Sequence, residues 1–351
     1  MISHPFMTPL ATRLYQAWQA AIADNKILSE FTAGAADPAG RWHQGDRILY
    51  GIRLQTGQPE YYARNLTQDS EVPGEVVEKS VGPYFCQLNG YRALRPGGSN
   101  RPLGRQPDIS AAPDHCRFHC MNPDHPLSLC DREPLLQVAL PNFVWHAYYN
   151  AAPLEKAGHF LWIPTEKSAN GVRLPHWPQR LSVAFFADMV ALLGELSDTI
   201  VFFNALHAGA SVNHIHFQAV YQRQPLPIES APAVDYQGVP LLKDYAIPAI
   251  AYSLQTPVDE MFAAIDWLQI HDIPFNLALV GSRVVIVPRN IDHEIVSEFP
   301  GDSLAALGMC GALKTISRQA YDTMDEVTIN RAFAKMTISG NQIVDAWQGL
   351  A

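Results

Sequence analysis

Hydrophobic residues recur with two different periods along the 351-residue chain, and each period predicts a different kind of element. Apolar positions that return about every four residues predict amphipathic helices, and at the first of them Thr8 and Pro9 suit the capping positions of a helix N-terminus. Helices are predicted over residues 8–28, from Pro178 through Leu196, and over residues 257–271. Shorter runs, broken by Gly, Pro and Asn, occupy residues 40–107 and predict strands.

The middle of the chain combines a hairpin pattern with a strand that carries histidines. Two strand-like runs flank the turn AAPLEKAG, so the second strand of this hairpin should begin at Gly158-His159. Further on, AGASVNHIHFQAVY alternates in period two, which places His214, His216 and Gln218 on one face of a strand. The small residues before it let backbone N–H groups approach a phosphate closely, and Gly209 can adopt a positive φ. The stretch predicts a phosphate cradle that leads into a His-bearing strand.

The hairpin pattern occurs twice. The stretch IPFNLALVGSRVVIVPRN repeats the Asn, the Gly-bearing turn and the strand ending at Pro found in NAAPLEKAGHFLWIPTEK, but it has no His after its Gly. A degenerate internal repeat is our interpretation, and chance similarity between two hairpins is the alternative. Three parts are predicted: an N-terminal helix and strand-rich segment (1–110), a catalytic unit (111–225) and a degenerate second unit (226–351).

Composition and charge narrow the class of protein. The chain is 48% apolar and 17% charged, which is typical of a globular protein and not of a disordered one. A formal net charge of −9 argues against a nucleic-acid partner, while a small anionic ligand remains compatible. The N-terminus lacks a secretory pattern, and no run approaches the roughly 20 apolar residues of a membrane helix, so we expect a cytoplasmic protein without a membrane partner. Five cysteines in a chain of this size do not indicate a disulfide framework.

These motifs resemble those of a known superfamily. GAS-VN-HIHFQ resembles the active-site strand of the histidine triad superfamily, in its transferase branch, because Gln218 stands where the hydrolases have a third His. NAAPLEKAGHFLWIP resembles the signature Asn-x(2)-Pro-x(4)-Gly-His-x(4)-Pro, and VGPYFCQLNGYRALRPGGSNRP resembles the N-terminal region of GDP-hexose phosphorylases. The resemblance spans roughly residues 80–340. It implies an α+β fold of two fused histidine-triad-like units, in which helices back an antiparallel sheet and the second unit is degenerate.

The resemblance also implies a reaction and a set of site residues. We expect a nucleotidyltransferase, a GDP-hexose phosphorylase that forms a covalent nucleotidyl-histidine. His216 is then the nucleophile, Gln218 and Ser211 stabilise charge, and His214 orients the site or binds a metal. The residues expected to bind substrate are Asn150, His159, Gly209 and Asn213. Neutral imidazole suits this role as both nucleophile and leaving group, and the Gln218 amide cannot shuttle a proton, which favours transfer over hydrolysis.

Three other functions stay open from the sequence. A diadenosine tetraphosphate phosphorylase and a sugar-1-phosphate uridylyltransferase share the motif and differ in the base they recognise. A nucleotide-binding protein without turnover is the non-enzymatic alternative. The expected partners are a nucleotide sugar and inorganic phosphate, with a homodimer as a possible assembly.

Two further clusters carry candidate chemistry. The segment DHCRFHCMNPDH holds His and Cys residues of the types that zinc favours, and by resemblance to some uridylyltransferases the ligands would be Cys116, Cys120, His176 and His214. No cofactor is required for the reaction, so such a zinc would be structural; free thiols are the alternative. Residues 96–114 are rich in Pro and Gly and predict a loop or lid. The arginines in or beside it suit the recognition of phosphate or of guanine edges, or they form a solvated basic loop: Arg92, Arg95, Arg101 and Arg105.

Overall fold

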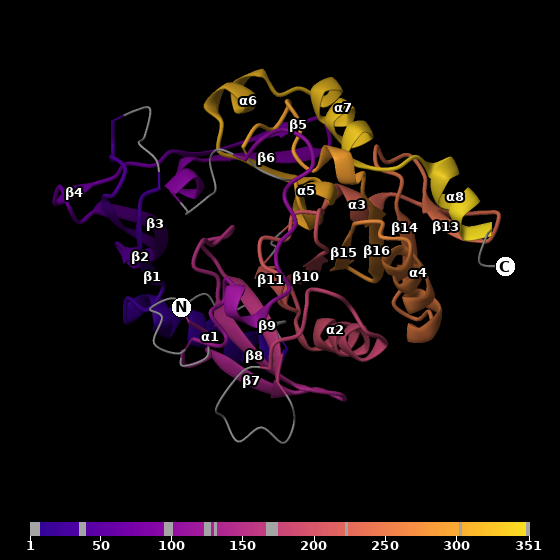
Figure 1. The fold of residues 1–351 in the computed structure, drawn as a ribbon, viewed down its shortest axis with the longest axis horizontal. Coiled ribbons are helices and arrows are strands. Elements are labelled where there is room, and N and C mark those ends of the chain that lie inside the picture. The colour runs from indigo at the N-terminus through magenta and orange to yellow at the C-terminus, as the bar shows by residue number, and fades with distance from the viewer. Residues whose placement is uncertain are drawn as a thin grey trace.

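The centre of the protein is one ten-stranded sheet in which every neighbouring pair is antiparallel (Figure 1). The computed structural model describes residues 8–34, 40–94, 101–122, 128–129, 132–165, 175–221, 224–301 and 304–348. The strands lie in the order β12 (Ala233–Tyr236), β13 (Val239–Leu242), β14 (Ile250–Ser253), β16 (Arg283–Pro288), β15 (Phe275–Val280), β10 (Thr199–Asn204), β11 (Phe217–Tyr221), β9 (His159–Thr165), β8 (Val144–Tyr149) and β7 (Leu136–Ala139). The sheet passes without a break from the predicted catalytic unit into the second unit where β10 pairs with β15.

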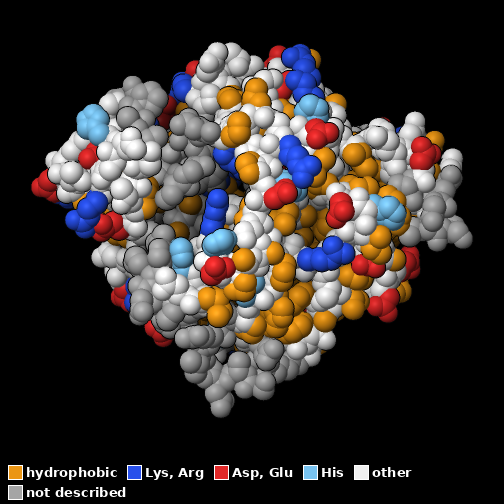
Figure 2. Space-filling model, viewed as in Figure 1, with side chains coloured by type: hydrophobic (Ala, Val, Ile, Leu, Met, Phe, Trp, Pro, Cys, Tyr) orange, Lys and Arg blue, Asp and Glu red, His pale blue; other side chains and the backbone are white. Residues whose placement is uncertain are grey.

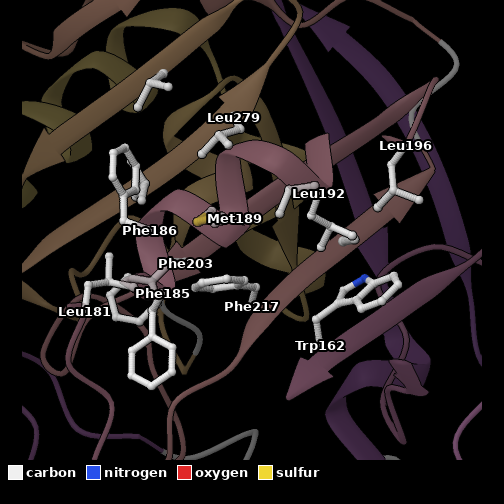
Figure 3. Close-up of a cluster of buried hydrophobic side chains, with 14 of the residues drawn as sticks. Trp162, Leu181, Phe185, Phe186, Met189, Leu192, Leu196, Phe203, Phe217 and Leu279 are labelled. Carbon is white, nitrogen blue, oxygen red and sulfur yellow. The ribbon is translucent and has the colours of Figure 1, made fainter. Parts of the chain in front are cut away.

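Helices cover one face of this sheet. They are α1 (Pro9–Ala23), α2 (Val183–Glu195) and α4 (Val258–Ile270), and their apolar stripes enter the largest core cluster. Figure 3 shows Phe186, Met189 and Leu192 of α2 pointing toward the strands, beside Phe217. Replacing one such buried side chain by Ala typically costs about 2–5 kcal/mol, so α2 is firmly attached to the sheet.

The helix boundaries differ from the predicted ones for local reasons. We predicted that α2 begins at Pro178, but it begins at Val183, because the Ser182 hydroxyl accepts a hydrogen bond from the Phe185 N–H at 3.2 Å and caps the helix there. The predicted cap of α1 is confirmed: the Thr8 hydroxyl accepts from the Ala11 N–H. This helix ends earlier than residue 28, because Asn25 turns the chain with a φ of +56° and Leu28 already belongs to β1.

A smaller sheet and the C-terminal helices cover the opposite face. The three-stranded sheet has the order β17 (Ala312–Thr315), β6 (Tyr84–Asn89) and β5 (Val76–Val81), and the helices packed there are α5 (Ala306–Met309), α6 (Arg318–Thr323) and α7 (Glu326–Met336). Figure 1 shows α6 next to β5 and β6 and α7 beside α6, and the Met336 carbonyl at the end of α7 accepts from the Asn290 N–H, just after β16. Residues 76–89 and 306–336, which are far apart in the sequence, therefore pack together on this face of the sheet.

The remaining elements lie around this body. A third sheet holds β1 (Leu28–Thr32), β2 (Arg47–Gln55), β3 (Gln58–Asn65) and β4 (Ser70–Glu71), which confirms strands in the region predicted from the pattern of residues 40–107. The short helices are α3 (Pro227–Ser230), η1 (Gly90–Leu94), η2 (Pro113–His115) and η3 (Ile291–His293), and α8 (Gly340–Gln348) lies near the C-terminus. Among the described residues, no helix has the length and apolar character needed to cross a membrane.

The architecture confirms the predicted α+β class, with an antiparallel sheet backed by helices. The predicted boundary near residue 225 falls between β11 and α3, and the three-part division of the chain stays a prediction. One strand is shorter than predicted, because β11 begins at Phe217 and not at His214. The Ile215 N–H donates to the Trp177 carbonyl at 2.8 Å, so the chain before β11 pairs with the segment that leads into α2 and not with the sheet.

Candidate active site

His216 lies immediately before β11, and its surroundings fix where its ring proton sits. The residue is 4% exposed, and its Nδ1 atom is 2.8 Å from the carbonyl oxygen of His214. Because a carbonyl oxygen can only accept, Nδ1 carries the proton and Nε2 keeps its lone pair. Burial is the main cause that lowers the pKa of His216 to about 4, so the ring is neutral at neutral pH. A neutral ring with an unprotonated Nε2 can act as a nucleophile.

Gln179 fixes the backbone of His216, a role that no sequence motif predicted. Its Oε1 accepts from the His216 N–H at 3.0 Å, and its Nε2 donates to the carbonyls of Asn204 at 3.0 Å and His216 at 3.4 Å. Gln179 is 5% exposed and lies in the extended segment before α2. Gln179 is the last residue of the motif HWPQ. Nothing in this motif indicates that its side chain binds a residue 37 positions away.

Gln218 lies on the same face of β11 as Val220, and its side chain meets His159 of β9. The Gln218 Oε1 atom is 2.9 Å from His159 Nε2. His159 is 1% exposed, and burial is the main cause that lowers its pKa to about 3. Asn150 caps the turn, because its Oδ1 accepts from the Ala152 N–H at 2.9 Å. His159 and Asn150 were predicted to bind substrate, and the contacts of these two side chains are with the protein itself.

The predicted phosphate cradle is a turn between β10 and β11. Gly209 adopts a φ of +95°, the left-handed conformation that its lack of a side chain allows. Ser211 is exposed, which leaves its hydroxyl accessible. Asn213 forms two hydrogen bonds within the protein, and its part in substrate binding stays a prediction. Its Oδ1 accepts from the Gln179 N–H at 2.9 Å, and its Nδ2 donates to the Ile109 carbonyl at 2.9 Å.

Residues of the second unit hold this cradle in place through hydrogen bonds. The Asn276 Nδ2 group donates to the Ala208 carbonyl at 2.6 Å and to the Asn204 Oδ1 atom at 2.8 Å. Asn276 and Asn204 are directly opposite each other in the β10–β15 pair. The buried guanidinium of Arg289 donates in turn to the Asn276 Oδ1 atom and to the Leu304 carbonyl. Asn276 and Arg289, at the two ends of the second hairpin, therefore brace the loop of the first unit.

Residues 101–117, here called the strap, cross the outside of the cradle. The Arg117 guanidinium donates to the Ser211 carbonyl at 3.2 Å. Arg101 forms an ion pair with the buried Glu294 at 3.0 Å, and Arg105 pairs with Asp108 at 3.2 Å. Figure 2 shows basic, acidic and His side chains intermixed around the middle of the face shown in Figure 1. The Arg101 and Arg105 side chains thus contact carboxylates of the protein.

Of the other two arginines of that cluster, the structure describes Arg92 but not Arg95. The Arg92 side chain is buried and donates to the Ala152 carbonyl at 3.3 Å, so it contacts the hairpin turn. Arg95 lies outside the described residues, as do residues 96–100 of the predicted loop and His125 of the His/Cys segment.

Four potential metal ligands come together at the end of the strap. One ligand atom from each of Cys116, Cys120, His176 and His214 lies within 4.8 Å of all the others. The Cys116 Sγ atom is 3.4 Å from His214 Nδ1, and the Cys120 Sγ atom is 3.3 Å from His176 Nδ1. The neighbouring Cys120 thiol, and then His214, lower the pKa of the Cys116 thiol well below its ordinary value. The ring of Phe118 contacts both His214 and His216, with centroids 5.5 and 5.1 Å apart.

Comparison with known proteins identifies the family. No protein-family model matches the chain. It is, however, 31% identical over 302 residues to a GDP-D-glucose phosphorylase of Macaca fascicularis, covering 78% of this chain and 74% of that relative. The chain belongs to the GDP-D-glucose phosphorylase family. The human GDP-D-glucose phosphorylase is 28% identical over 303 residues, and a GDP-L-galactose phosphorylase of Arabidopsis thaliana is 30% identical over 152 residues, 40% of this chain and 33% of that one.

Solved structures agree with this assignment at the level of fold. The phosphorylase chain described here superimposes on a yeast Ap4A phosphorylase with a TM-score of 0.56 and 14% identity, covering 94% of this chain and 95% of that one. The same yeast enzyme in complex with Ap4A gives a TM-score of 0.54 over 96% and 99% of the two chains. The predicted histidine-triad-like fold and the predicted class of enzyme, a nucleotidyltransferase, are both confirmed.

Proposed function

We propose that this enzyme is a GDP-hexose phosphorylase that works through a guanylyl group on His216 Nε2. The observation that carries the proposal is the hydrogen bond from His216 Nδ1 to the His214 carbonyl, since it leaves a lone pair on Nε2. The substrate class rests on the relatives, which are named GDP-D-glucose and GDP-L-galactose phosphorylases.

The reaction has two in-line displacements at the α-phosphorus. In the first, His216 Nε2 forms a P–N bond, and the bond to the bridging oxygen breaks, so that hexose 1-phosphate departs with the electron pair. In the second, an oxygen of inorganic phosphate forms a new P–O bond, the P–N bond breaks, and the electron pair returns to Nε2. The products are hexose 1-phosphate and GDP. Burial keeps His216 neutral, which leaves it ready for the first step and makes it a good leaving group in the second.

Positioned donors would stabilise the charge that develops on the phosphoryl oxygens. The amide nitrogen of Gln218, the Ser211 hydroxyl and backbone N–H groups around Gly209 are the candidates. His214 orients the nucleophile: its carbonyl accepts from His216 Nδ1, while its own ring faces Cys116. Asn213, Asn150 and His159 act through the protein contacts described above.

The proposal includes a structural zinc ion held by Cys116, Cys120, His176 and His214. Two thiolates and two imidazoles are a donor set that zinc favours, and the proximity of the four ligand atoms suits a tetrahedral site. The His176 Nε2 atom is 3.0 Å from the Ala111 carbonyl, so it carries the ring proton and leaves Nδ1 available as a ligand. Bound zinc would fasten the strap to the segment before β11 and would take no part in the chemistry.

Metal analysis tests the zinc proposal separately from activity. The purified protein should hold about one zinc per chain, and Cys116→Ser should lower both zinc content and thermal stability. Cys86→Ser is the matched control, because Cys86 is also buried but belongs to β6, outside the four-residue cluster. A wild-type protein that is fully stable and carries no metal would rule out the structural zinc.

Intact-protein mass spectrometry tests the reaction. The protein is incubated briefly with GDP-hexoses, UDP-hexoses or Ap4A in the absence of phosphate, beside His216→Asn. A guanylyl adduct on wild type alone, which phosphate then discharges as GDP, is the expected result. A uridylyl or adenylyl adduct would assign the enzyme to one of the other two transferase types. Absence of an adduct with every donor would contradict the covalent mechanism.

A further inference from the structure

A chain of hydrogen bonds connects the turn after β8 to the amide of Gln218. The turn occupies residues 150–158, and the peptide group of Leu154 stands at its centre. The Leu154 N–H donates to His159 Nδ1 at 2.9 Å, and His159 Nε2 lies 2.9 Å from Gln218 Oε1. Both contacts have the length of a good hydrogen bond, so the donor and the acceptor of each can be assigned one after the other.

The first contact fixes the tautomer of His159. A backbone N–H can only donate, and therefore His159 Nδ1 must accept and carries no proton. The ring is 1% exposed and stays neutral, so its one proton sits on Nε2. The 3.4 Å approach of the Asn150 amide nitrogen to Nε2 brings two donors together and is not a hydrogen bond.

The tautomer in turn orients Gln218. Because His159 Nε2–H donates, the atom of Gln218 that faces it must be the oxygen, and this assignment follows from the donor pattern alone. The amide NH₂ group then points away from His159. Among the described residues no protein acceptor is seen for that NH₂ group, so both of its protons remain for a ligand.

Two residues from distant parts of the chain hold the Leu154 peptide in place. Its carbonyl accepts from the Tyr61 hydroxyl at 2.9 Å and from Lys314 Nζ at 3.0 Å. Tyr61 comes from β3 and Lys314 from β17, and both side chains are largely buried. Lys314 also donates to Gln87 and forms an ion pair with Glu155, so the ammonium charge is balanced inside the protein. The sequence gives no indication that these residues meet.

We propose that His159 is a positioning residue that selects inorganic phosphate over water as the acceptor by holding the Gln218 amide with its NH₂ group toward the reacting phosphorus. The inference rests on the proposed guanylyl-His216 intermediate. Tyr61 and Lys314 support the same orientation by fixing the Leu154 peptide that determines the tautomer.

Phosphate and water, the two acceptors, require different groups from residue 218: phosphate requires a hydrogen-bond donor and water an acceptor. Phosphate arrives as an anion: its oxygen bonds to phosphorus as the P–N bond breaks, the electron pair returns to His216 Nε2, and no proton needs to be removed by the enzyme. Such an acceptor gains from N–H donors. Water must instead be oriented by a hydrogen-bond acceptor, as a Gln orients it in GTPases, and its proton passes to His216 Nε2 as the P–N bond breaks. A flipped Gln218 would present its oxygen, repel the phosphate anion and favour water.

The partition of the intermediate tests this inference. Guanylyl-enzyme is formed with GDP-hexose and then chased with phosphate, and the products are counted as GDP from transfer and GMP from hydrolysis. His159→Phe keeps a ring in the buried site but removes the donor to Gln218, and we expect the GMP:GDP ratio to rise about tenfold, which corresponds to about 1.4 kcal/mol of selectivity. Lys314→Met should raise the ratio by a smaller factor.

Two controls separate orientation from simple disturbance. His146→Phe makes the same exchange in the neighbouring strand β8, outside the hydrogen-bond chain, and should leave the ratio unchanged. Gln218→Met removes the amide entirely and should slow transfer without raising hydrolysis. An equal GMP:GDP ratio in wild type and His159→Phe, with the adduct still formed, overturns the inference. Failure of wild type to form the adduct would instead contradict the proposed function.

A spectroscopic measurement needs neither turnover nor a folded variant. Two-bond ¹H–¹⁵N correlation spectra of the wild-type protein should show His159 as the Nε2–H tautomer between pH 5 and pH 8. The pattern of the Nδ1–H tautomer, or of a protonated ring, would overturn the assignment of the Gln218 amide.

Discussion

The two hairpins of the large sheet that share the repeated pattern, β8–β9 and β15–β16, have similar strands and very different turns. In the first, β8 and β9 are joined by the nine residues 150–158; in the second, β15 and β16 are joined by Gly281 and Ser282 alone. The long turn brings the Leu154 N–H over the sheet and onto His159, which a two-residue turn cannot do. The second hairpin instead directs Asn276 and Arg289 to carbonyls inside the protein. The catalytic unit and the second, supporting unit therefore differ more in their turns than in their strands.

The largest effect should come from the nucleophile in the first unit. His216→Asn removes the ring nitrogen that attacks phosphorus, and we expect activity to fall on the order of 10⁴-fold or more. Stability should change little, because an amide can still reach the His214 carbonyl. Steady-state rates and thermal melting, measured on the same preparation, check both halves of this prediction. A variant that keeps even one tenth of the wild-type rate would place the chemistry elsewhere.

In the second unit, removal of the buried Arg289 guanidinium should mainly reduce stability, whereas His216→Asn should mainly reduce activity. Arg289→Met leaves the carbonyls of Met336 and Leu304 and the Asn276 Oδ1 atom without their donor, and we expect a loss of about 3–5 kcal/mol in the free energy of unfolding. Arg283→Met, at the other end of β16, is the control and should cost about 1 kcal/mol, since that half-buried side chain donates to a single carbonyl. Urea unfolding measures the difference. Equal losses would mean that Arg289 does not brace the cradle.

The glycines of the two turns give a matched comparison. A Cβ atom at Gly158, where φ is +153°, would lie 2.6 Å from the Tyr221 ring and 2.7 Å from the Phe160 ring. Both rings are buried, and the Tyr221 hydroxyl is held by the Ala11 carbonyl, so neither ring can move away easily. Gly158→Ala should therefore cost about 3 kcal/mol. At Gly281, where φ is +57°, the nearest atom is a carboxylate oxygen at the end of the long Glu229 side chain, and Gly281→Ala should cost about 1–2 kcal/mol. The same urea titration checks both, and a larger cost at Gly281 would contradict the comparison.

The sequence could predict what depends on local pattern. Thr8 and Pro9 indicated the start of α1, the AAPLEKAG turn indicated a strand beginning at His159, and the resemblance brought Cys116 and His214 into one candidate metal site. It could not predict side-chain partners from distant segments. Gln179 binds His216 across 37 residues, and Lys314 reaches Leu154 across 160.

The substrate-binding roles predicted for Asn213 and His159 depend on partners of the same kind. An Asn or a His in a strand can serve a ligand or the protein, and only the folded neighbours decide which. Asn213 finds the Gln179 N–H and the Ile109 carbonyl, and His159 finds a backbone N–H in its own turn. These partners satisfy both side chains within the protein.

The smallest effect concerns the pH dependence of stability. Burial lowers the pKa of His159 to about 3, against about 6.5 in the unfolded chain. Between these values the unfolded state binds a proton that the folded state does not, so His159 costs stability as the pH falls below about 6.5 and has no effect above it. The free energy of unfolding should drop by about 1.4 kcal/mol per pH unit from this residue alone. His159→Phe should lose that slope, so the difference between the two proteins, measured by urea unfolding at pH 7 and pH 5.5, isolates it. Parallel pH profiles would mean that the His159 ring is not held neutral, and the orientation of Gln218 would lose its support.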